Sequence, residues 1–210
     1  MSASDAPVRE PGTRARSGNA MARTRAALLA ATGQCLARYG VRKTTMVDVA
    51  ERSRVAKATL YNHFRTKDDL LAAYVEDRVA ALVRTAAAAA ADGLPAALTA
   101  VSTALAEDPA LRRAAVEEPA VLGALARPSE GRGWAAARDG VRTVLAAARV
   151  EADDAQVELV LRWVTSQLLW PADGATAGAL VGALVGVPAS PPAPPAERNT
   201  AAPAAVGWPR

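Results

Sequence analysis

The 210-residue sequence predicts an all-α protein, with an N-terminal head of three helices followed by a larger C-terminal helical body. Apolar residues make up 51% of the chain, but aromatic residues make up only 4%, and much of the apolar content is alanine. Such a composition suits closely packed helices better than the faces of a sheet. Apolar side chains also recur at helical spacing almost throughout, and no segment shows the alternation of a strand.

Charge divides the chain close to the predicted boundary between head and body. Residues 1–67 contain 13 Lys and Arg against 4 Asp and Glu, whereas residues 68–210 contain 12 against 17. All three lysines and the one histidine lie between Lys43 and Lys67. A basic head on a mildly acidic body indicates that the head binds a polyanion.

The first two helices of the head have clear local end signals. A helix over about 21–39 is followed by Gly40, which suits a left-handed stop position. Thr45 begins a second helix and is spaced to form a capping box with Asp48, and this helix ends near Ser53.

A short turn through Arg54 and Val55 leads to a third helix over about 56–64, which completes a helix-turn-helix pattern. Leu60 and Phe64 share one face of this helix and are expected to point to the core. The rest of the surface lacks the acid–base pairs that solubilise most helices, which a DNA-binding role explains. It is a short polar strip with basic flanks: Lys57, Ala58, Thr59, Tyr61, Asn62, His63 and Arg65.

Thr66 is the predicted cap of the fourth helix and is spaced to form a second capping box with Asp69. Lys67 follows it and so stands where the helix dipole disfavours a cation. A DNA phosphate would pair with Lys67 and with the free N–H groups of this helix end. The alternative is that Asp68 and Asp69 compensate and that Lys67 is only solvated.

The body is predicted to be helical to its end, and both termini are predicted to be disordered. Residues 1–19 form a basic arm, 20–66 the head, 67–187 the body, and 188–210 a tail that holds seven of the 14 prolines. After the fourth helix, which ends at Asp92 and Gly93, helices are expected near 95–106, 109–117, 119–127, 134–148, 154–170 and 175–187.

Over about residues 23–71 the chain resembles the tetracycline-repressor (TetR) family of bacterial transcriptional regulators. The likeness rests on Tyr39 and Gly40, on the segment 44–50, and on the Thr-Leu-Tyr-x-His-Phe-x-x-Lys core of 59–67. The resemblance implies that phosphates are held by Thr45, Tyr61, His63 and Lys67, and that base contacts come from Lys57, Ala58, Thr59 and Asn62. Tyr61 or His63 could instead be structural, and Thr45 could serve only as a cap.

Three positions depart from the family pattern. Arg54 stands where the family usually has glycine in the turn, and Ala56 stands where a serine usually caps the recognition helix. Ala58 also occupies a position where glycine is common. These changes put the base contacts in question but not the fold.

For the body, the resemblance implies dimerisation and a small-molecule effector of unknown identity. A homodimer is expected through about 156–187, on a pseudo-palindromic DNA operator, because one helix-turn-helix grips too little DNA to be selective. A repressor released by its effector is the predicted function, and an activator or a helix-turn-helix module that binds protein are the alternatives. The candidate ligand-contacting residues are Tyr74, Ser102, Trp134, Trp163 and Gln167, each of which could equally be core or interface.

One histidine and one cysteine cannot assemble a nucleophilic triad or a His/Cys metal site. The sequence therefore predicts no enzyme activity, no cofactor and no metal. No stretch approaches the length of a membrane span, no signal peptide is evident, and Cys35 has no cysteine partner within the chain. These features predict a cytoplasmic protein that does not enter a membrane.

Overall fold

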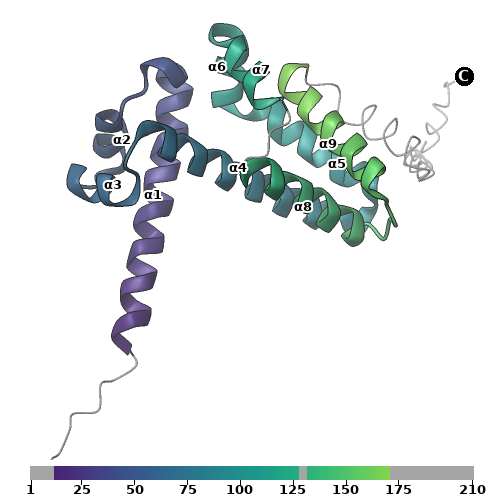
Figure 1. Ribbon diagram of the computed structural model, residues 1–210, viewed down its shortest axis with the longest axis horizontal. Coiled ribbons are helices and arrows are strands. Elements are labelled where there is room, and N and C mark those ends of the chain that lie inside the picture. The colour runs from purple at the N-terminus through teal and green to yellow at the C-terminus, as the bar shows by residue number, and fades with distance from the viewer. Residues whose placement is uncertain (1–11, 128–131, 171–210) are drawn as a thin grey trace, which may run out of the picture.

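The computed structural model describes residues 12–127 and 132–170, and within these ranges the chain is helical and has no strand, as predicted (Figure 1). A 3₁₀ turn (Ala90–Asp92) joins the fourth and fifth of the described helices. The helices are α1 (Gly12–Lys43), α2 (Met46–Ser53), α3 (Lys57–His63), α4 (Lys67–Ala89), α5 (Leu94–Glu107), α6 (Pro109–Glu117), α7 (Pro119–Leu125), α8 (Arg132–Ala147) and α9 (Asp154–Leu169).

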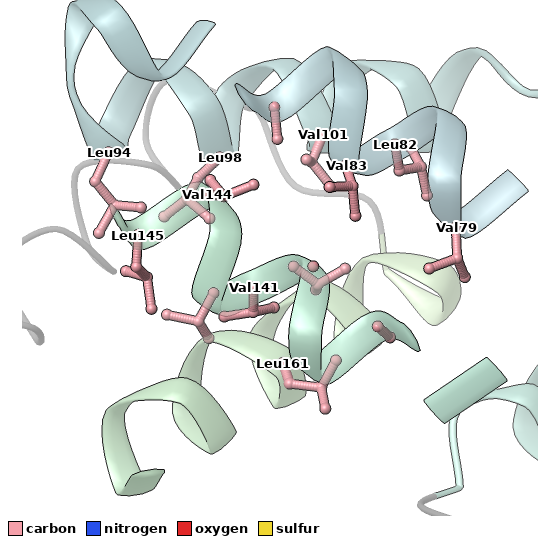
Figure 2. A pocket seen from close by; sticks show the side chains of 15 residues that line it. Val79, Leu82, Val83, Leu94, Leu98, Val101, Val141, Val144, Leu145 and Leu161 are labelled. Carbon is pink, nitrogen blue, oxygen red and sulfur yellow. The ribbon is translucent and has the colours of Figure 1, made fainter. Parts of the chain in front are cut away.

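The body is built on α4, which leaves the head and runs alongside α8, with α5 and α9 packed against this pair (Figure 1). The close approach of α4 and α8 requires glycine at position 140, because a Cβ there would lie 2.3 Å from Cγ2 of Val83. Between these four helices lies a cavity of about 90 Å³, into which aliphatic side chains project (Figure 2).

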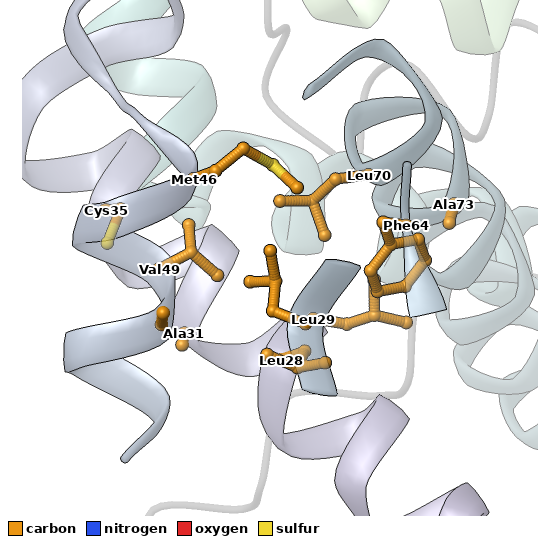
Figure 3. Close-up of a cluster of buried hydrophobic side chains, with 11 residues drawn as sticks. Leu28, Leu29, Ala31, Cys35, Met46, Val49, Phe64, Leu70 and Ala73 are labelled. Atoms are coloured by element: carbon orange, nitrogen blue, oxygen red, sulfur yellow. The ribbon is translucent and has the colours of Figure 1, made fainter. Parts of the chain in front are cut away.

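The head consists of α1, α2, α3 and the first turns of α4, packed around one apolar cluster (Figure 3). Leu28 and Leu60 are fully buried there, and Leu70 and Ala73 of α4 belong to the same cluster. α4 therefore belongs to the head at its start and to the body along the rest of its length. Because the helix is continuous, a displacement of α4 in the body reaches the head directly.

The helix ends agree with the predicted ones to within a few residues, except at the start of α1. This helix begins at Gly12 rather than near Met21, so residues 12–19 are helical and the prediction of disorder is wrong for them. Extending an existing helix needs no new nucleus, and these residues contain no proline. The predicted helix over 175–187, residues 1–11 and the tail over 188–210 lie outside the described residues.

Among the described helices, none is long and apolar enough to cross a membrane.

Candidate nucleic-acid interface

The N-terminus of α2 is held by the capping box that the sequence predicts. The Thr45 side chain accepts a hydrogen bond from the Asp48 backbone N–H (3.2 Å), and the Asp48 carboxylate accepts one from the Thr45 N–H (2.8 Å). The Thr45 hydroxyl also donates to Asp48 (2.6 Å), and these hydrogen bonds lower the pKa of the Asp48 carboxyl. Thr45 is exposed, so its cap leaves the hydroxyl next to solvent at the helix end.

Arg54 occupies the turn in a left-handed conformation, with φ 56° and ψ 28°. The turn ends α2 in the usual way for such a residue, because the N–H groups of Arg54 and Val55 donate to the carbonyl oxygens of Glu51 and Ala50. Ala56 then precedes α3 without any side-chain cap. The two departures from the family pattern are therefore accommodated without loss of the turn, at a cost in backbone strain and in one missing cap.

The exposed face of α3 is the face that the helical wheel predicts. Leu60 and Phe64 are 0% and 4% exposed and belong to the head core. Arg25 of α1 lies over the Phe64 ring, 5.1 Å from its centre, which further fixes the end of α3. The candidate contact residues divide into exposed Lys57, Ala58, Tyr61 and Asn62 and half-buried Thr59 and His63.

Lys67 has protein partners that the sequence did not indicate. Its ammonium group donates to the carbonyl oxygens of Val41 (2.6 Å) and Arg42 (3.2 Å), which lie just after Gly40 interrupts α1. The adjacent Thr66 caps α4 through a second predicted capping box, with Asp69. The unfavourable position of the cation at a helix N-terminus is thus offset by two backbone carbonyl groups.

Glu118 holds the same turn from the opposite side, and sequence reasoning missed it. Its carboxylate accepts hydrogen bonds from the N–H groups of Val41 (2.6 Å) and Arg42 (2.8 Å). Burial alone would raise the pKa of Glu118. The hydrogen bonds from Arg42 and Val41 and the charges of Arg42 and Lys67 together outweigh this effect, so the pKa of Glu118 lies below its ordinary value. The one feature of the sequence that singles out Glu118 is Pro119, because a residue before proline is kept out of the helical conformation.

The residues predicted to contact an effector do not lie together, and none lines the cavity of the body. Ser102 and Gln167 are buried and joined by a hydrogen bond of 3.1 Å between α5 and α9. Tyr74 packs against the head core, where burial and then the charge of Asp108 raise its pKa to about 12. Trp163 packs against the body core, and Trp134 is half-buried near the start of α8.

The cavity is instead lined entirely by aliphatic residues and one glycine. Its walls carry no hydroxyl, amide or ionisable side chain, and α4, α5, α8 and α9 all contribute to them. The lining residues are Val79, Leu82, Val83, Ala86, Leu94, Leu98, Val101, Ala137, Gly140, Val141, Val144, Leu145, Val160, Leu161 and Val164.

Within the described ranges, no group of three or more His, Cys, Asp and Glu side chains is placed to hold a metal ion. Cys35 is buried in the head core, where burial raises the pKa of its thiol.

An exposed third helix behind a capped second helix and a tight turn defines a helix-turn-helix DNA-binding protein. Residues 28–74 match the family model described as "Bacterial regulatory proteins, tetR family". Over residues 28–74 the head therefore matches the TetR-family DNA-binding domain, in agreement with the resemblance.

Two solved structures extend the likeness to the whole fold. The TetR family repressor AlkX from Dietzia sp., implicated in biodegradation of n-alkanes, is 21% identical, with a TM-score of 0.60 over 77% of this chain and 92% of that one. SmeT, the repressor of the Stenotrophomonas maltophilia multidrug efflux pump SmeDEF, is 23% identical, with a TM-score of 0.52 over 82% of this chain and 97% of that one. No curated protein sequence matches the chain.

The left-handed Arg54 predicts that Arg54→Gly raises the free energy of unfolding by about 1 kcal/mol, because glycine adopts this conformation without strain. Urea unfolding followed by circular dichroism measures the change. Arg52→Gly, the same substitution inside α2, serves as the control and should destabilise, because it also removes the hydrogen bond to Gln34. An Arg54→Gly protein no more stable than the wild type would show that the turn is not strained.

Proposed function

We propose that this chain is a homodimeric transcriptional repressor that binds a pseudo-palindromic operator through α3 and leaves it when an uncharged hydrophobic effector enters the body. The observation that carries the DNA-binding part is the exposed strip of α3, framed by the capped N-termini of α2 and α4. Helix N-termini attract phosphates, and the strip between them is free to meet base edges in the major groove. Such a role on the chromosome implies a cytoplasmic protein.

The proposed contacts divide into those that position the head and those that read sequence. Thr45, Tyr61, His63 and Lys67 hold phosphates, and for Lys67 this requires its third N–H donor, since two already reach Val41 and Arg42. Base edges are read by residues at the start and centre of α3, namely the exposed Lys57, Ala58 and Asn62 and the half-buried Thr59.

Dimerisation through α9 is supported by the apolar residues that this helix leaves exposed. Val157, Val160 and Leu161 are buried in the body, whereas Leu159 and Leu169 on the same helix are 37% and 39% exposed. Trp170, directly after α9, is 78% exposed. An isolated chain would keep these side chains in water, so we propose that a second copy covers them, together with the part of 156–187 beyond the described residues.

The chemistry of the cavity determines which effector it can accept. A charged or strongly polar molecule would lose its hydration there and gain no hydrogen bond, which costs several kcal/mol. Apolar cavities of roughly 150 Å³ stay dry and bind molecules such as benzene or xenon. The proposed effector is therefore a hydrocarbon or a molecule with a large hydrocarbon part, and its entry enlarges the cavity by moving α4 relative to α8.

DNA binding is tested by a mobility shift on the DNA upstream of the protein's own gene. Wild type should shift this fragment with an affinity that falls steeply as salt rises, and Tyr61→Ala with Lys67→Ala should abolish the shift. Asn62→Ala should change the preferred sequence by about 1–3 kcal/mol at one base pair rather than weaken all sequences equally. Val116→Ala, at an exposed site in the body, is the control. An undiminished shift with the double variant would refute the assignment of the DNA-binding face.

Effector binding is tested with n-hexane, n-octane and n-decane against octanoate and octylamine, added to the protein without DNA. The alkanes should raise the melting temperature and the two charged molecules should not. Val141→Phe fills the cavity and should remove the alkane effect, whereas Val116→Phe, outside the cavity, should keep it. Leu161→Ala enlarges the cavity and should shift the preference to the longer alkane.

Operator release is measured separately, by fluorescence anisotropy of labelled operator. Alkanes that bind but do not release DNA would refute the regulatory role and leave the ligand class standing. Charged molecules that bind better than alkanes would refute the ligand class.

A further inference from the structure

We infer that Glu118 is a positioning residue that locks the orientation of the head on the body, and that this lock sets the half-site spacing which the dimer accepts. The inference rests on the proposed function, since half-site spacing has a meaning only for a dimer on a pseudo-palindrome.

The first step is that α6 is tied at both ends. At its start, the buried carboxylate of Asp108 pairs with Arg78 of α4 (2.9 Å) and accepts hydrogen bonds from the N–H groups of Ala110 and Leu111. At its end, Glu118 accepts the two N–H groups of Val41 and Arg42. A helix of nine residues fixed in this way acts as a strut between α4 in the body and the end of α1 in the head.

The second step is that α6 adds a constraint that α4 alone lacks. α4 is one continuous helix whose first turns belong to the head, so a connection through α4 alone lets the head turn relative to the body whenever this helix bends or twists. α6 packs along the end of α1, with Ala114 buried at 4% exposure, and so supplies a second attachment away from the axis of α4 (Figure 1). Two attachments that do not share an axis fix the rotation of the head.

The third step is that the carboxylate of Glu118 lies very close to the backbone at Gly40. Gly40 has φ 81°, and a Cβ at this position would lie 2.9 Å from Oε2 of Glu118. A Cβ at residue 40 would therefore displace the carboxylate of Glu118, and the positive φ of this residue independently favours glycine.

The fourth step leads from this turn to the DNA-binding face. The Thr44 hydroxyl donates to the Gly40 carbonyl oxygen (2.6 Å), and Thr44 is buried. The next residue, Thr45, caps α2. Glu118 thus fixes the positions of Val41 and Arg42, and these residues lie only a few positions before α2, which the proposed function places against DNA.

The test uses the full-length protein with Glu118→Ala and with Glu118→Gln, which keeps the shape of the side chain but not its charge. The matched control is Glu117→Gln, since the carboxylate of Glu117 pairs with Arg113 within α6 rather than with the turn after Gly40. Amide hydrogen exchange without DNA reports on the N–H groups of Val41 and Arg42. Operator affinity is measured on the preferred operator and on one with a single base pair inserted between the half-sites.

We expect both Glu118 variants to lose protection at Val41 and Arg42 and to discriminate between the two operators about tenfold less than wild type does. Glu117→Gln should change neither measurement. Unchanged amide protection at Val41 and Arg42 would overturn the inference. Affinities that fall equally on both operators would also overturn it, because a general loss of stability has that result.

A wild-type protein that binds no operator would refute the proposed function and with it the role in spacing. The exchange measurement would still decide whether Glu118 holds the turn. Should Glu118→Ala fail to fold, Glu118→Gln gives the same two measurements.

Discussion

The end of α1 depends on one physical requirement, which is that backbone N–H and C=O groups at an interrupted helix find partners. Gly40 breaks α1, and the exposed groups of Val41 and Arg42 are satisfied by two side chains from other parts of the chain. Lys67 of α4 takes the carbonyl oxygens and Glu118 takes the N–H groups. The hydrogen bonds that satisfy the backbone groups of this one turn therefore also join the head to the body.

One lysine of the basic cluster, Lys67, takes part in this junction. Lys67 binds the carbonyl oxygens and Glu118 the N–H groups of Val41 and Arg42, and the charge of Lys67 helps to lower the pKa of Glu118. Lys67 stands at the start of α4, the helix that also lines the cavity further along. One residue thus belongs both to the proposed phosphate contacts and to the attachment between head and body.

The sequence predicted the parts of the fold that local rules determine. Both capping boxes, the end of α2 and the buried face of α3 follow from residues within one helix or turn, and all are confirmed. Glu118 could not be found in this way, because its partners lie 76 and 77 residues away and no periodicity connects them. The cavity could not be predicted for a related reason, because its lining consists of aliphatic residues whose pattern in the sequence is that of an ordinary core.

The cavity and the junction share α4, which gives the proposed release a direction. At Gly140 the backbone of α8 lies so close to Val83 that a molecule larger than the cavity of about 90 Å³ would have to push α4 and α8 apart. α4 is held to the start of α6 by Arg78 and Asp108, so α6 has to follow it or break that pair. In the first case Glu118 pulls on Val41 and Arg42, and in the second α6 no longer fixes the head. Either response would change how the two heads of the proposed dimer are oriented, and with it the half-site spacing that they match.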